Sequence, residues 1–365
     1  MGAGLLPFLP ELKEIKSMRK RFTIGDVAKL AGVGKVTVSY VLNGRGDENR
    51  ISKETQERIL AAATELEYQP SAVARSLVSK QANAISVVFQ YADYFKASSS
   101  FINELMHGVC EACVEADINL ILHTRTFSNA REEAAALMDG RSDGALVLRD
   151  FKDPLLHELQ SRQFPMVLFF SRSVDGNVSF VDSDNYSGGL MATNHLIDLG
   201  HRRIGMVTGS RGSVASNDRQ QGYRQALQLA NIDFDDALIK EHRTPDSVNQ
   251  SLVDWIHNTT PTGLVCWSDD VAFACMKTLS QAGIKIPDDI SIVGFDSSEA
   301  CERVTPQLSS MRQPVLEIAR SAAQTLIAAT RQLPHQTQNI FPLTLDVRES
   351  TKQQIVETSS LKRIP

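Results

Sequence analysis

From residue 84 onward, short apolar runs alternate with segments of helical periodicity, and this alternation constrains the fold of the 365-residue chain more than any other feature. The strand-like runs are residues 85–89, 118–123, 144–148, 166–170, 204–208, 264–267 and 290–294. The helical segments between them are residues 101–116, 154–162, 186–199, 220–230 and 271–282. Such alternation builds a parallel sheet with right-handed crossovers. The sequence therefore predicts an α/β fold of about 280 residues, large enough for two lobes, with a passage between them near residues 178–184.

The charge of the chain is unevenly distributed. The whole chain carries −5, but residues 19–80 hold 11 basic and 7 acidic residues and so carry +4. Residues 1–18 balance at zero, which leaves −9 for residues 81–365. A small basic segment before a larger acidic body indicates that the first part meets a polyanion, although a basic segment is often only a solvated surface.

The basic segment has the pattern of a helix-turn-helix. Thr23 is a helix cap with Asp26 three residues later, and an apolar face follows as far as Gly32, a residue that tolerates the left-handed backbone of a helix end. A second helix is predicted over residues 35–42, and Ser52 caps a third whose apolar face closes a three-helix core. The alternative is a plain helical mini-domain.

In a helix-turn-helix the second helix lies in the major groove of DNA. Its outward residues are Lys35, Val36, Thr37, Ser39 and Tyr40. Lys35 can donate to guanine and Val36 can contact a thymine methyl, whereas the three hydroxyls suit phosphate oxygens, and Tyr40 can also reach a base.

Residues 71–78 after Pro70 predict a short helix of marginal stability. Ala72, Val73, Ala74 and Leu77 are apolar in a polar surrounding, but one or two helical turns are unstable alone in water. We expect this segment to form a helix only when it pairs with a twin or is pressed against DNA; the alternative is an inert linker.

Catalytic and cofactor motifs are missing from the sequence. No glycine-rich nucleotide motif follows a predicted strand, and neither a nucleophile elbow nor a zinc motif occurs. Cys110 and Cys113 lie inside a predicted helix, so a structural role is favoured over redox chemistry. Five cysteines, no membrane-length apolar run and no signal-like start lead us to expect free thiols in the cytoplasm, no cofactor and no metal.

The head resembles the LacI/GalR family of bacterial transcription regulators. The motifs that carry the resemblance are residues 23–33 (TIGDVAKLAGV), 37–44 (TVSYVLNG), 52–63 (SKETQERILAAA) and 68–77 (YQPSAVARSL). Gly34 departs from the family's usual serine, and residues 45–50 form a longer loop than usual. The resemblance implies a homodimer on a pseudo-palindromic operator, with paired hinge helices and Leu77 wedged into the minor groove. Its implied DNA contacts also include Thr23, Asn43, Ser71, Ala72 and Arg75.

The body resembles the type I periplasmic-binding-protein fold of the same family. The matching segments are residues 199–205 (LGHRRIG), 286–296 (IPDDISIVGFD), 306–314 (PQLSSMRQP) and 341–350 (FPLTLDVRES). Residues 306–314 should return the chain to the first lobe. Residues 341–350 should form the closing strand of the second lobe.

The resemblance also implies an effector site between the lobes. Arg219 matches the family's effector-binding arginine, Asp296 its aspartate, and Ser268 a polar position. A charged fork and a carboxylate suit a sugar or nucleoside. Aromatic candidates are Tyr91, Phe101, Phe170, Trp267 and Phe295, each of which could equally belong to the core. The apolar strand end at Phe170 departs from the aspartate of many sugar-binding members, unless Arg172 shifts into register.

These observations predict the following organisation. The segments are a dispensable extension (1–17), a DNA-binding domain (18–69), a hinge and linker (70–83), an effector and dimerisation domain (84–351) and a tail (352–365). We expect the first lobe to comprise residues 84–181 and 313–338, and the second to comprise residues 182–312 and 339–351. The predicted function is an effector-controlled transcription regulator that acts as a repressor and is not an enzyme. An α/β enzyme and a free-standing solute-binding protein are the alternatives.

Overall fold

The computed structural model describes residues 22–69, 81–90, 100–173 and 178–354. The chain divides into two compact units, residues 1–80 and 81–365. The expected extension, the hinge residues Ser71, Ala72, Arg75 and Leu77, and Tyr91 lie outside the described residues.

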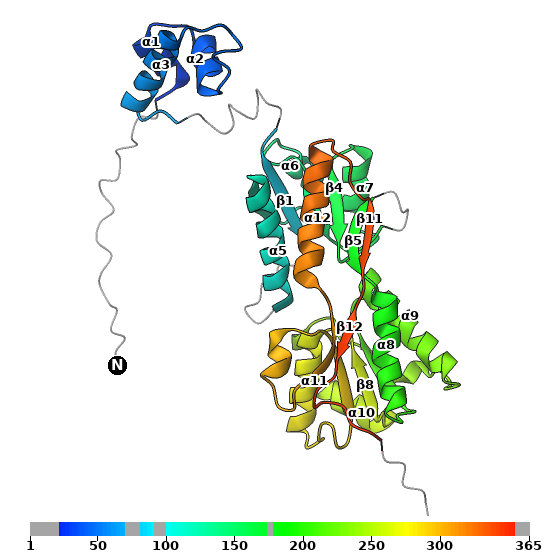
Figure 1. The fold of residues 1–365 in the computed structure, drawn as a ribbon. Coiled ribbons are helices and arrows are strands. Elements are labelled where there is room, and N and C mark those ends of the chain that lie inside the picture. Colours follow the sequence, from blue (N-terminus) through cyan, green and yellow to red (C-terminus); the bar gives the residue numbers. More distant parts are fainter. Residues whose placement is uncertain (1–21, 70–80, 91–99, 174–177, 355–365) are drawn as a thin grey trace, which may run out of the picture. The chain divides into compact units, whose positions relative to one another are not determined.

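The smaller unit is the predicted three-helix domain (Figure 1). It consists of α1 (Ile24–Ala31), α2 (Lys35–Leu42) and α3 (Lys53–Glu65). Thr23 and Asp26 form a capping box at the start of α1, and Gly32 ends that helix with a φ of 64°. The buried side chains of the three helices make one small core: Val27, Ala28, Ala31, Val38, Val41, Ile59, Ala62 and Ala63. Local signals thus set the helix ends, and the shared apolar faces hold the helices together.

The larger unit contains two six-stranded sheets, one in each lobe. The first sheet has the order β11-β5-β4-β3-β1-β2, and its described pairs are all parallel. Its strands are β1 (Ala84–Phe89), β2 (Asn119–His123), β3 (Ala145–Leu148), β4 (Met166–Phe169), β5 (Ser179–Ser183) and β11 (Gln338–Phe341). One face packs on α5 (Ser100–Ala116) and α12 (Val315–Thr330), and the other packs on α6 (Ala130–Leu137) and α7 (Pro154–Ser161).

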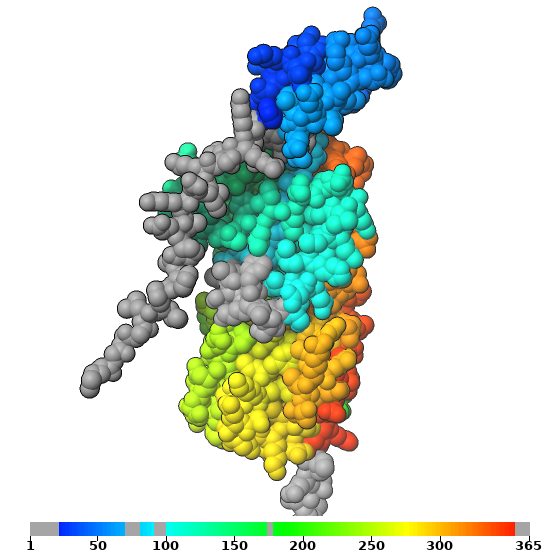
Figure 2. Space-filling model, turned by 90° about the vertical axis from the view of Figure 1, so that its left-hand side faces the viewer, coloured from blue at the N-terminus to red at the C-terminus, as the bar shows by residue number. Residues whose placement is uncertain are grey.

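The second sheet has the order β12-β10-β9-β8-β6-β7, parallel except for the β10–β12 pair. Its strands are β6 (Ile204–Thr208), β7 (Ile239–Glu241), β8 (Gly263–Cys266), β9 (Ser291–Asp296), β10 (Ser309–Arg312) and β12 (Thr344–Asp346). One face packs on α8 (Asn185–Asp198) and α9 (Val214–Leu229), and the other packs on α10 (Gln250–Thr259) and α11 (Asp269–Gln281). Figure 2 shows α5 (turquoise) on the surface of the first lobe and α10 (yellow) on that of the second.

The chain crosses between the lobes three times: from β5 to α8, from β10 to α12 and from β11 to β12. The expected passage at residues 178–184 is mostly strand β5 of the first sheet. The expected boundary between residues 338 and 339 is wrong, because all of β11 pairs in parallel with β5 in the first sheet. The last crossing therefore follows Phe341, and only the segment from β12 onward belongs to the second lobe.

Candidate DNA-binding surface and interlobe site

Helix α2 presents the side chains that the sequence predicts for DNA. Within α2 only Val38 and Val41 are buried, and Val36 is 64% exposed. The other predicted contacts are exposed or half-buried: Thr23, Lys35, Thr37, Ser39, Tyr40 and Asn43. Two of these side chains already make local contacts, because Thr23 caps α1 and Asn43 Nδ2 donates to the Ser39 carbonyl at 2.8 Å. The accessible face of α2 is therefore available to a DNA groove.

The two departures from the family pattern have structural consequences. Gly34 is the N-cap of α2 and makes no side-chain cap hydrogen bond, as its missing hydroxyl predicts. The longer loop is tied back to α3, since Asp47 accepts from Lys53 Nζ at 2.9 Å and from Gln56 Nε2 at 2.8 Å. The Arg45 guanidinium lies 5.7 Å from the centroid of the Tyr40 ring. The loop thus adds a cation beside the predicted reading face.

Arg219 in the larger unit is held by contacts from three elements. Its side chain is 5% exposed. Its Nε donates to Asn185 Oδ1 at 2.9 Å, its Nη1 donates to the Trp267 carbonyl, and the guanidinium lies over the Phe295 ring. Burial lowers the pKa of Arg219 to about 10, so the group stays charged at neutral pH. Its Nη2 makes no hydrogen bond to a residue within the described ranges.

Asp296 ends β9 in the same lobe and has a φ of 120°, a backbone conformation that L side chains rarely adopt. Its Oδ1 accepts from Gln313 Nε2 at 2.5 Å, and Gln313 Oε1 accepts from Ser183 Oγ at 2.6 Å. Burial raises the pKa of Asp296 well above its usual value; nearby Asp269 raises it further, whereas Arg219 lowers it. The structure therefore brings Arg219 and Asp296 into one electrostatic site.

Asn185 and Gln313 belong to this site but were not predicted from the sequence. Asn185 begins α8, and Gln313 follows β10 at a crossing between the lobes. No sequence motif of a binding site marks either amide. Their positions after strands β5 and β10, each followed by a crossing, are the only sequence signal that could have indicated them.

Ser268 has a local structural role as the N-cap of α11. Its Oγ accepts from the Val271 backbone N–H at 3.4 Å, and the residue is buried. The next residue, Asp269, is also buried and accepts from Ser310 Oγ at 2.5 Å and from the Ser298 N–H at 2.8 Å. These contacts stabilise the start of α11 beside Asp296.

The predicted aromatic residues divide between the lobes. Phe101 of α5 and Phe170 form an edge-on pair in the first lobe with ring centroids 4.8 Å apart, and both pack against the core of that lobe. Phe170 has a φ of 52°, which is rare for a bulky residue. Trp267 and Phe295 lie in the second lobe, around Arg219. Within the described residues, no ring contact, ion pair or side-chain hydrogen bond joins the first pair to Arg219 or Asp296.

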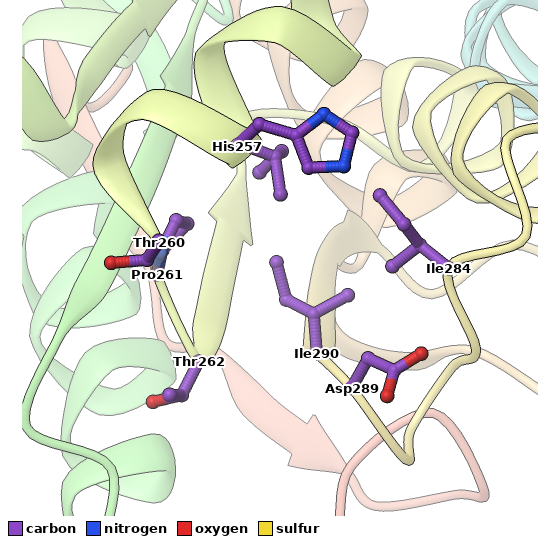
Figure 3. Close-up of a pocket in the computed structure, with 8 residues that line it drawn as sticks. His257, Thr260, Pro261, Thr262, Ile284, Asp289 and Ile290 are labelled. Atoms are coloured by element: carbon purple, nitrogen blue, oxygen red, sulfur yellow. The ribbon is translucent and has the colours of Figure 1, made fainter.

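A cavity of about 320 Å³ lies elsewhere in the second lobe, at the opposite ends of the strands from Asp296 (Figure 3). Its lining is Ile256, His257, Thr260, Pro261, Thr262, Ile284, Asp289 and Ile290. These residues lie before β8 and β9 rather than after them. The cavity is therefore separate from the predicted effector site.

A helix-turn-helix domain joined by one chain to a two-lobed α/β domain defines a ligand-binding DNA regulator. Residues 23–71 match the family described as "Bacterial regulatory proteins, lacI family", and residues 193–351 match the "Periplasmic binding protein-like domain". With full-length relatives at about the 30% level, the chain belongs to the LacI family of bacterial regulatory proteins.

Two relatives and one solved structure illustrate this membership. The chain is 31% identical to the transcriptional repressor PurR of Photobacterium profundum over 342 residues, which cover 90% of this chain and 98% of the relative. It is 32% identical to the transcriptional regulator CelR of Thermobifida fusca over 340 residues, which cover 91% and 99%. A solved CelR–cellobiose complex has 30% identity and a TM-score of 0.69, with 90% of this chain and 100% of that chain covered. The protein is therefore a DNA-binding transcription regulator, and these relatives are regulators rather than enzymes. Within the described residues, no helix is long and apolar enough to cross a membrane.

Proposed function

We propose that this protein is a repressor whose affinity for operator DNA is controlled by an uncharged, hydroxyl-rich effector of the sugar or nucleoside class. The effector lies between the lobes, and the protein acts as a homodimer on a pseudo-palindromic operator. The observation that carries the proposal is the joint placement of Arg219, which is buried, and Asp296, which is half-buried, with each side chain held by an amide. The free cysteines among the described residues support work in the reducing cytoplasm.

The chemistry of the site supports the ligand class. Arg219 Nη2 and Asp296 Oδ2 make no hydrogen bond to a described residue, so they offer one donor and one acceptor. A hydroxyl donates to a carboxylate and accepts from a guanidinium, so one sugar edge can satisfy both groups. Arg219 and Asp296 each favour the charged form of the other, because Asp296 raises the pKa of Arg219 and Arg219 lowers that of Asp296. This mutual compensation favours a neutral ligand. The similar solved structure of a CelR–cellobiose complex supports a sugar.

Control of DNA binding requires that the effector bind two lobe arrangements with different affinities. Arg219 and Asp296 are held by residues at crossings between the lobes. Asn185 begins α8, just after the first crossing, and Gln313 lies between β10 and α12, on the second crossing. A change in lobe arrangement therefore alters the site. We infer that the hinge residues Ser71, Ala72, Arg75 and Leu77 transmit this change to the DNA head.

The experiment combines operator binding with ligand titration on purified full-length variants. The operator is selected from a palindromic DNA library, and a thermal-shift screen of sugars and nucleosides, with cellobiose included, identifies the effector. Arg219→Ala and Asp296→Ala should abolish the effector response and leave ligand-free operator binding within a few-fold. Leu77→Ala should weaken specific DNA binding and spare effector affinity. Wild-type effector affinity in Arg219→Ala would show that the site lies elsewhere.

A further inference from the structure

Arg172 lies between carboxylates of both lobes. It follows β4 of the first lobe, and its Nη2 contacts Asp218 Oδ2 of α9 in the second lobe. Its Nε lies 3.6 Å from Oδ2 of Asp182, a residue of β5 in the first lobe that is 1% exposed. This distance is too long for a hydrogen bond. One guanidinium therefore faces one acceptor from each lobe.

The hydrogen bonding of this group is incomplete. Two buried atoms of this group have no hydrogen-bond partner among the described residues: Arg172 Nε and Asp182 Oδ2. An unsatisfied buried polar group costs free energy, so each atom gains from any movement that completes a bond. If Asp218 moves away with α9, Arg172 can approach Asp182 and satisfy that oxygen. The Asp182 carboxylate therefore lowers the free-energy cost of breaking the Arg172–Asp218 contact between the lobes.

The group is connected to the proposed effector site. Asp218 directly precedes Arg219 in α9. Asn185 Nδ2 donates to Asp182 Oδ1 at 3.1 Å, and Asn185 Oδ1 accepts from Arg219 Nε at 2.9 Å. A movement that separates Arg172 from Asp218 therefore displaces the helix that carries Arg219.

We propose that Arg172 is a positioning residue that holds the two lobes together through Asp218 and exchanges to Asp182 when they separate. Its guanidinium neutralises whichever carboxylate it approaches, so the chain has two defined arrangements rather than a continuous range. The role of this exchange in regulation rests on the proposed function: an effector that binds one arrangement of the lobes more tightly shifts the exchange toward that arrangement. The exchange itself needs neither effector nor DNA.

The test measures the distance between the lobes in the ligand-free, full-length protein. Spin labels are placed at His157 on α7 and Gln228 on α9, both exposed, in a Cys110→Ser background. Labelled chains are mixed with excess unlabelled protein so that each dimer carries one labelled chain. Pulsed electron–electron double resonance then gives the distribution of distances between the two labels. Arg172→Gln and Asp218→Asn should each add or enlarge a longer-distance population.

Two further variants separate this role from a general loss of stability. Arg172→Lys keeps a cation for Asp218 and should restore the shorter distance. Arg162→Gln removes an arginine of the same lobe with the same 30% side-chain exposure, paired with Glu158, and should leave the distribution unchanged. If Asp218→Asn, with a cooperative unfolding transition, keeps the wild-type distribution, the proposal is wrong. That result would leave the proposed effector control intact, since the measurement contains no effector.

Discussion

The guanidinium carbon of Arg219 lies 3.4 Å from the centroid of the Phe295 ring. Phe295 directly precedes Asp296 in β9. A guanidinium over an aromatic face gains electrostatic attraction, and the gain is larger when water is excluded. The ring therefore offsets part of the cost of burying the arginine, whose donors reach Asn185 Oδ1 and the Trp267 carbonyl. In the proposed effector site, the Phe295 ring, the Asn185 amide and the Trp267 carbonyl all hold this one side chain.

Gly189→Ala should disturb this arrangement from a distance. A Cβ at Gly189 would stand 2.1 Å from the backbone carbonyl oxygen of Arg219, so α8 and α9 would have to separate. We expect a loss of stability of roughly 1–3 kcal/mol, as for other overpacked interiors. Effector affinity should also fall, because Arg219 moves with its backbone. Denaturant unfolding and calorimetric titration measure the two effects; unchanged values in both would contradict the close helix packing.

Lys35→Ala should remove sequence preference rather than affinity alone. Lys35 is exposed at the start of α2, where side chains reach base edges. The expected cost is roughly 1–3 kcal/mol with relaxed preference at one base pair of each half-site. Lys29→Ala is the matched control, since it removes an exposed lysine from α1. Binding to a set of single-base operator variants measures the preference. Equal weakening on every sequence would make Lys35 a phosphate contact.

Gly34→Ser should stabilise the DNA-binding head slightly. The N-cap of α2 lacks a side-chain hydrogen bond, and a Cβ at Gly34 would meet only Thr37 Oγ1, at 3.8 Å. A serine hydroxyl can accept from an orphan N–H of the first turn, a gain of only a few tenths of a kcal/mol over glycine. Gly34→Ala is the control without a hydroxyl. Thermal unfolding of the protein followed by circular dichroism compares them; a Ser variant no more stable than the Ala variant argues against a missing cap.

Asp182→Asn should stabilise the protein near neutral pH. Burial raises the pKa of Asp182 to about 6, although Arg172 and Arg219 oppose this shift. The folded state therefore favours the protonated form, and stability from this group is present below an unfolded pKa of about 4 and is lost as pH rises through 6. Asparagine stays neutral, so its advantage should be roughly 2–3 kcal/mol at pH 7.5 and should shrink toward pH 4. Unfolding midpoints across this range measure the difference; a constant difference would contradict the raised pKa.

The sequence by itself determined the elements with strong local signals. Thr23 with Asp26 and the left-handed Gly32 set the ends of α1, and the apolar spacing of α1–α3 built a core without help from the rest of the chain. The alternation of apolar runs and helices likewise determined the α/β class. Helix α12 was not predicted; it follows Pro314 and has no side-chain cap, so its start lacks the usual local signal.

Only the tertiary structure decided which distant residues meet. Ser183 contacts Gln313 across 130 positions, and Arg172 contacts Asp218 across the two lobes. The order of strands in a sheet is a long-range property, since a strand's own pattern does not state its neighbour. For this reason β11 lies in the first sheet despite the expected boundary. For the same reason Asn185 and Gln313 reach the proposed effector site although no motif marks them. The local sequence therefore determined which segments form helices and strands. The three crossings between the lobes determined which distant side chains meet.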